Sequence, residues 1–318
     1  MRRKTCYRKQ LKNGGGVILI SAVLSMTYIA TAATTNEMPS VAPSKSDYQM
    51  RVEFTEKLKN LVSEKKVVAA SQLWEQLKAE NRFKDKVTLA DNDNKKLTTP
   101  EIYHSKQKGV LVFGYVYKCN RCPKWHASTA GGFVISKDGL AVTSYSFINK
   151  DNAEAFGAFN IDGDFFQVEK VVASSQKNDL AIVKLKSVNN GAFHPLALQS
   201  TLPHVGSEVT VIYHLINSRF FSVSTGIISR YYFPFQRDVS KRDSLRIAIS
   251  ASLTGNDFLI HNNDRKISKN RADGSFGCPV FDDTGSVIGV VAQTKETGHN
   301  KTIFPTRFPI YKQAIVPK

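Results

Sequence analysis

Two cysteines and a histidine lie close together in the stretch CNRCPKWH, where their spacing suits either a metal ion or a disulfide bond. Cys119, Cys122 and His126 form a C-x2-C-x3-H pattern, which supplies three zinc ligands and leaves the fourth to another group. A local disulfide between the two cysteines is the alternative, and an oxidising compartment favours it. The spacing is not that of a c-type haem attachment motif, because three residues separate Cys122 from His126.

Three further stretches combine glycines, hydroxyls and a carboxylate. They are GGFVISKDGLAVTSYSFI (131–148), NDLAIVKL (178–185) and GSFGCPVFDDTGSVIGVV (274–291). In order and spacing, and together with VSTGIISR (223–230), they resemble the motif blocks of trypsin-like serine peptidases of the HtrA type. The resemblance covers roughly residues 105–312. It implies a mainly β protein of two six-stranded β-barrels, with the active site in the cleft between them.

The resemblance also says which residues should do the chemistry. The family uses a serine nucleophile, a histidine that takes its proton and an aspartate that orients the histidine. Asp179, in the Asn-Asp-Leu-Ala motif, retains the aspartate, but Ser146 occupies the histidine position and Phe276 the serine position. A hydroxyl cannot act as a general base near neutral pH, and a phenyl ring has no nucleophilic atom. The resemblance therefore predicts a scaffold without serine-peptidase chemistry.

Some parts of such a site do not depend on the missing side chains. The backbone N–H groups of Gly274 and Phe276 are the expected oxyanion-hole donors. Ser275 and Cys278 are the neighbouring groups for a rearranged nucleophile, although Ser275 should point elsewhere and inward packing explains a small cysteine. We expect surface or packed positions, and no role as a substitute base, for His104, His194, His204, His214 and His261.

The elements that must position these residues are strands. From about Gly109, short runs rich in Val and Ile alternate with turn residues, and Asp-Gly or Thr-Gly pairs mark hairpins at 138–139, 162–163 and 284–285. About ten strands without an intervening helical stripe predict an all-β barrel or sandwich. The predicted strands are 109–118, 131–136, 140–145, 179–185, 208–215, 221–229, 245–250 and 287–294.

Residues 48–97 carry helical rather than strand periodicity. Two apolar stripes, the first with i, i+4, i+7 and i+8 spacing and the second with i, i+3, i+4 and i+7 spacing, predict a small helical hairpin, which a linker joins to a peptidase domain at 98–318. Thr99 is the expected cap of a further short helix, with Pro100 at its first position. The stripes consist of Phe54, Leu58, Leu61 and Val62, and of Ala70, Leu73, Trp74 and Leu77.

The N-terminus has the pattern of an export signal. Residues 1–32 hold six basic and no acidic residues, an apolar stretch and the small residues Ala30-Thr31-Ala32, as in a secretory signal peptide. A spacer rich in Ser, Pro and Thr follows at 33–47. The sequence thus predicts an exported protein, periplasmic or secreted, with an uncleaved membrane anchor as the alternative.

Charge and length limit the partners. Without residues 1–32 the formal charge falls from +17 to +11, and the remaining excess is spread along the chain, which predicts only weak binding to anionic surfaces. No nucleic-acid motif and no cofactor site is recognisable, and we expect no PDZ domain. An apparent insertion at 252–273 is either a surface loop or a recognition loop. The expected function is a pseudopeptidase that binds a polypeptide or another envelope client, and the alternative is an endopeptidase with a rearranged site.

Overall fold

The computed structural model describes most of the chain from residue 45 onward. Gly274, the insertion at 252–273, the predicted signal peptide and nearly all of the spacer lie outside the described residues. No helix in the described part is long and apolar enough to cross a membrane. The described residues are 45–79, 88–92, 94–176, 178–199, 201–215, 217–232, 246–250, 275–292 and 304–307.

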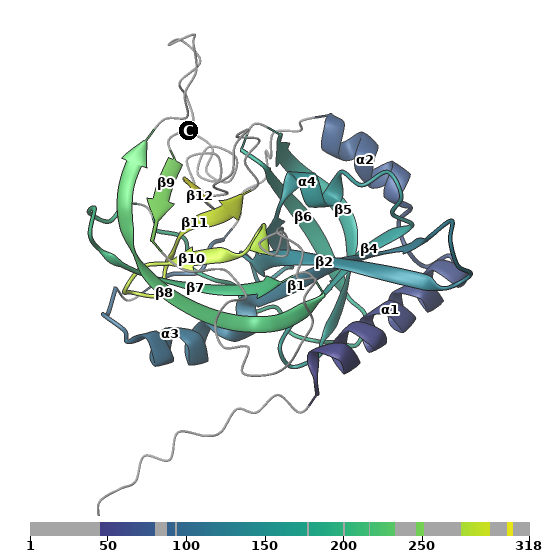
Figure 1. The fold of residues 1–318 in the computed structure, drawn as a ribbon, viewed down its shortest axis with the longest axis horizontal. Coiled ribbons are helices and arrows are strands. Elements are labelled where there is room, and N and C mark those ends of the chain that lie inside the picture. Colours follow the sequence, from purple (N-terminus) through teal and green to yellow (C-terminus); the bar gives the residue numbers. More distant parts are fainter. Residues whose placement is uncertain are drawn as a thin grey trace, which may run out of the picture. The chain divides into compact units, whose positions relative to one another are not determined.

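Two closed barrels of six antiparallel strands form the protein (Figure 1). Around the first barrel the strands follow the order β1-β2-β3-β6-β5-β4, and around the second β10-β11-β12-β9-β8-β7. The first contains β1 (Val110–Lys118), β2 (Trp125–Val134), β3 (Leu140–Thr143), β4 (Ala155–Phe159), β5 (Phe165–Ser175) and β6 (Leu180–Ser187). The second contains β7 (Glu208–Leu215), β8 (Ser218–Tyr232), β9 (Arg246–Ile249), β10 (Pro279–Phe281), β11 (Val287–Ala292) and β12 (Phe304–Arg307). The predicted mainly β, two-barrel architecture is confirmed.

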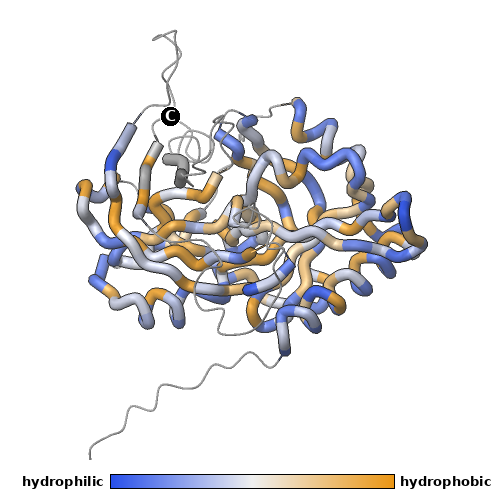
Figure 2. Tube along the Cα trace, in the orientation of Figure 1, coloured by the Kyte–Doolittle hydropathy of each residue, from blue (hydrophilic) through white to orange (hydrophobic). Residues whose placement is uncertain are grey.

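Apolar strands and glycine turns build the barrels. Figure 2 shows the apolar residues concentrated along the strands, and β3, β10 and β11 are buried along their whole described length. The three predicted hairpin turns hold glycines with positive φ, from +74° to +92°. The strand runs identified in the sequence omitted β4, β5 and β12, whereas β10 is the first strand of the predicted hairpin at 284–285. The run AFGAF of β4 is buried on both faces, so it lacks the alternation that marks a half-exposed strand.

The N-terminal helices pack on the first barrel. Helix α1 (Asp47–Ser63) lies against β4, β2 and β1, whereas α2 (Ala70–Lys78) lies against β5 and the short helix α4 (Tyr145–Ile148). The two helices therefore cover different parts of the barrel, and the apolar face of each packs against barrel residues.

Phe54 shows how α1 is held. Its ring is buried and lies 5.5 Å from the ring of Phe159 and 5.6 Å from that of Phe165, measured between centroids. Burying a phenylalanine contributes about 1.5–3 kcal/mol. At the start of the helix, the Asp47 carboxylate accepts a hydrogen bond of 2.6 Å from the backbone N–H of Arg219 in β8. Helix α1 thus contacts both barrels.

The chain segment that precedes β1 packs along the second barrel. The Asn92 side chain donates to the Thr284 carbonyl and to the Ser286 hydroxyl, and the Leu97 N–H donates to the Asp283 carbonyl. Helix α3 (Thr99–Lys106) follows, with a 3₁₀ turn at Gln107–Gly109. Its cap is Thr98 and not the predicted Thr99, because the Glu101 side chain completes a capping box with Thr98.

Candidate functional site

Asp179 lies at the turn between β5 and β6, directly before Leu180. Its side chain is buried, and its backbone adopts a left-handed conformation with φ +52°. The turn is held by the Asp179 N–H, which donates to the Gln176 carbonyl, and by the Asn178 side chain, which donates to the Ser175 hydroxyl. A buried carboxylate needs hydrogen-bond donors, and two serines of the first barrel supply them.

Ser144 and Ser146 surround the Asp179 carboxylate. The Ser144 hydroxyl lies 2.9 Å from each carboxylate oxygen, and the Ser146 backbone N–H donates to Oδ1 at 2.7 Å. Ser144 also caps α4 by accepting from the Phe147 N–H, and its oxygen lies 2.8 Å from that of Ser146. The position that the resemblance assigns to the base therefore does lie beside Asp179, but it offers a hydroxyl.

The turn that carries Phe276 meets the first barrel at Gly131 and Ser144. The Gly131 N–H donates to the Phe276 carbonyl at 2.8 Å. Gly277 has φ +89°, and a Cβ there would lie 2.2 Å from the Gly131 carbonyl oxygen and 3.1 Å from the Ser144 nitrogen. Only glycine fits so close an approach. We call this meeting of Gly131, Ser144 and residues 275–278, together with their hydrogen-bonded neighbours Ser146, Asp179 and His214, the barrel junction.

The Phe276 ring is half-buried and packs against the apolar core of the second barrel. No described residue accepts a hydrogen bond from the Phe276 N–H. The N–H groups of Phe276 and Gly274 are the expected oxyanion-hole donors, and Gly274 lies outside the described residues.

Cys278 and Ser275 are both fully buried at the junction. A Cβ on Gly131 would lie 2.1 Å from the Cys278 sulfur, which shows how tightly the thiol is packed against β2. Burial raises the pKa of the Cys278 thiol to about 12, so it stays protonated. The Ser275 hydroxyl donates to the His214 carbonyl at 2.8 Å. Neither side chain has the exposure or activation that a nucleophile needs.

His214 links the two barrels, a role that sequence reasoning missed. Its Nε2 donates to the Leu111 carbonyl of β1, and its Nδ1 accepts from the Phe221 N–H of β8, each at 3.0 Å. Burial lowers the pKa of His214 to about 4 against the opposing effect of the Leu111 bond, so the ring is neutral. A histidine near the end of the largely apolar run EVTVIYHL was the available signal.

The remaining histidines fit the expected surface or packed positions where the structure describes them. His104 is half-buried in α3, and His194 and His204 are exposed. His261 lies outside the described residues.

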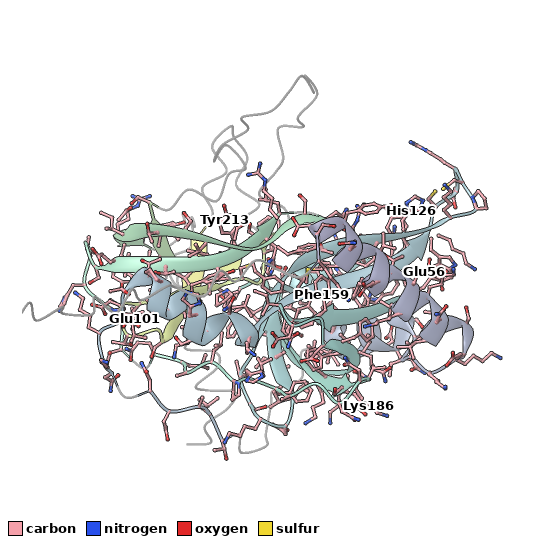
Figure 3. All side chains as sticks on the ribbon, turned by 90° about the horizontal axis from the view of Figure 1, so that it is seen from below. Glu56, Glu101, His126, Phe159, Lys186 and Tyr213 are labelled. Atoms are coloured by element: carbon pink, nitrogen blue, oxygen red, sulfur yellow. The ribbon has the colours of Figure 1, made fainter. Side chains whose placement is uncertain are left out.

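Cys119, Cys122 and His126 do come together, in the turn between β1 and β2 and at the start of β2. The two cysteine sulfurs lie 3.2 Å apart. The Cys122 sulfur lies 3.0 Å from Nε2 of His126, which Figure 3 labels near the end of the hairpin.

Comparison with known protein families agrees with the two-barrel fold. A family model described as a trypsin-like peptidase domain matches residues 130–290, from β2 to β11. The match includes Ser146, Asp179 and Phe276 and begins after the cluster at 119–126. No curated protein matches the sequence.

Proposed function

The chain belongs to the trypsin-like peptidase domain family, and from this premise we propose that it is an exported pseudopeptidase. The fold binds a polypeptide client of the cell envelope and does not cleave it. The family relation supports the scaffold, and the residues of the barrel junction support the loss of chemistry.

One observation carries the proposal. The Asp179 carboxylate is bound by the Ser144 hydroxyl and the Ser146 N–H, at the place where the family mechanism requires an imidazole. Without a base, a serine hydroxyl is not activated, and at the nucleophile position there is only the ring of Phe276. Losing both groups removes nearly all of the acceleration, because the members of such a triad act as a unit.

A rearranged active site would need another nucleophile at the junction. The Ser275 hydroxyl donates a hydrogen bond to the backbone carbonyl of His214. The Cys278 thiol is buried, and burial raises its pKa. Neither arrangement supports the endopeptidase alternative.

Hydrolysis is the first test. The full chain is incubated with fluorescent casein and with a fluorophosphonate probe beside the variants Phe276→Ala and Cys278→Ala, purified in the same way. We expect the wild-type protein to show no more turnover and no more labelling than the variants. Any contaminating peptidase would be present equally in all three preparations. Turnover by the wild type that either variant abolishes would overturn the pseudopeptidase proposal.

Client binding is a separate test. Fluorescence anisotropy with a labelled, permanently unfolded polypeptide, such as reduced and carboxymethylated lactalbumin, should show saturable binding without cleavage. A salt titration separates this from adhesion through the excess positive charge, because binding between exposed charges weakens strongly as salt rises. Absence of saturable binding, or its complete loss at raised salt, contradicts a polypeptide-binding role.

Export is tested by fractionating cells that express the full chain and by determining the N-terminus of the exported form. We expect a mature protein that begins near residue 33. A protein that stays in the cytoplasm contradicts the export part of the proposal and leaves the pseudopeptidase part standing.

A further inference from the structure

The end of the β1–β2 hairpin gathers three metal-binding side chains that the peptidase fold does not use. Cys119, Cys122 and His126 each offer one ligand atom, and these atoms all lie within 4.8 Å of one another. All three side chains are half-buried. The cluster lies outside the residues of the barrel junction, and Figure 1 shows the hairpin extending from the first barrel away from the second.

Strand pairing positions the histidine opposite the cysteine turn. Tyr117 of β1 pairs with His126 of β2, and Lys118 pairs with Trp125, so the six residues between them close the hairpin. The Tyr117 ring stacks on the His126 ring at 5.4 Å between centroids and an angle of 28°. This stacking directs Nε2 toward the Cys122 sulfur, at 3.0 Å. The imidazole is thus oriented before any ligand binds.

The distances suit a metal ion of zinc size. Zn–S bonds of about 2.3 Å in a tetrahedron place two sulfurs about 3.8 Å apart. The observed separation of 3.2 Å therefore needs to widen by only about half an ångström. Cys119 and Cys122 lie three residues apart in one tight turn, so a small rotation of each side chain is enough.

The chemistry of the donors selects a soft divalent cation. Two sulfurs and one imidazole nitrogen are ligands that zinc binds well, whereas magnesium and calcium prefer oxygen.

We propose that the end of the β1–β2 hairpin is a zinc site, with Cys119 Sγ, Cys122 Sγ and His126 Nε2 as ligands. On binding, each thiol releases its proton and each thiolate forms a bond to the metal. Two thiolates neutralise the charge of Zn²⁺, and the described residues supply no fourth ligand, so that position takes a water molecule or a ligand from outside them. The metal ties the turn to β2.

The test uses the full chain, purified with reductant and stripped of metal. Zn²⁺ titration with a competing chromophoric chelator should give one tight site per chain, with Kd below about 1 µM. Co²⁺ in place of Zn²⁺ should give the sulfur-to-cobalt charge-transfer band and the intense visible bands of a tetrahedral centre. Zn²⁺ should also raise Tm by several degrees, since it binds the folded hairpin.

Matched variants separate the cluster from other thiols and imidazoles. Cys119→Ser, Cys122→Ser and His126→Ala should each weaken Zn²⁺ binding about a hundredfold or more and remove the cobalt spectrum. His204→Ala and Cys278→Ala should leave both unchanged, because these residues lie outside the cluster. Circular dichroism of each variant shows whether it has folded.

Two results would overturn the inference. One is stoichiometric Zn²⁺ binding that survives in all three ligand variants. The other is a chain isolated without reductant from the exported fraction that contains no metal and shows by mass spectrometry a bond between Cys119 and Cys122. In that case the pair forms a disulfide. Neither result bears on the hydrolysis test, so the pseudopeptidase proposal stands or falls separately.

Discussion

Strand β2 joins the barrel junction to the end of the β1–β2 hairpin. The reactive groups of these two regions differ in how far they are buried. At the junction, Asp179, Ser275 and Cys278 are buried, and the hydrogen-bonding partners of the first two are fixed within the fold. On the hairpin, two thiols and an imidazole are partly exposed and face one another. The polar groups of the junction have become part of the structure, whereas those of the hairpin remain available for chemistry.

The difference shows where this fold can hold a reactive site. Burial between two barrels demands that each polar group find a partner, and a partner that satisfies a group also reduces its reactivity. The end of a hairpin carries no such demand, because water satisfies its groups until a ligand arrives. Four predictions test this contrast, from the largest effect to the smallest.

Thiol alkylation should separate the two regions most strongly. In metal-free, reduced protein at pH 8, iodoacetamide should modify Cys119 and Cys122 at least roughly a thousandfold faster than Cys278, whose pKa near 12 leaves almost no thiolate. Peptide mass spectrometry over time gives the three rates. Comparable rates in folded protein would show that the junction is open, and equal rates in denaturant are the control.

His214 should make the junction sensitive to acid. Because folding lowers its pKa from 6.5 to about 4, the unfolded chain binds one more proton between these pH values, so stability is complete above pH 6.5 and falls as pH drops toward 4. The loss attributable to this group is about 3 kcal/mol. Urea unfolding as a function of pH measures it. His214→Asn, which does not titrate, should have a correspondingly flatter profile over this window.

The Asp179 carboxylate should contribute to the free energy of unfolding. Asp179→Ala leaves the Ser144 hydroxyl and the Ser146 N–H without their acceptor, which should lower the free energy of unfolding by about 2–3 kcal/mol. Ser144→Ala, which removes one donor, should cost about 1–2 kcal/mol. Chemical denaturation measures both. An Asp179→Ala variant as stable as the wild type would mean that the carboxylate is only a remnant of the ancestral site.

The hairpin thiols should contribute least to the metal-free fold. Cys119→Ser/Cys122→Ser should change the unfolding free energy of reduced, metal-free protein by no more than about 0.5 kcal/mol, because both side chains are only partly buried. The same denaturation experiment measures the change. A loss of several kcal/mol would show that the cluster is structural in the absence of any metal.

Much of the fold, and the types of residue at the candidate site, could be predicted from the sequence. Alternating apolar runs and Asp-Gly turns predicted most strands, and the motif spacing placed Ser146 beside Asp179 correctly. The strand β4 was missed because its run AFGAF holds no β-branched residue, whereas the equally buried β3 and β11 hold Val, Thr or Ile and were predicted. The two N-terminal stripes were recognised as helices, but which surface each would cover depended on the closed barrel.

By itself, the sequence determined that a serine and a phenylalanine occupy the positions that the resemblance assigns to the base and to the nucleophile. It also determined that two thiols and an imidazole are close neighbours, because a short turn joins them. Only the tertiary structure decided which groups satisfy Asp179, and that His214 turns inward to join the barrels. Those contacts join residues 35 positions apart, Ser144 and Asp179, and 103 positions apart, Leu111 and His214. Contacts over such separations exist only after the barrels close and bury polar groups that must then find partners.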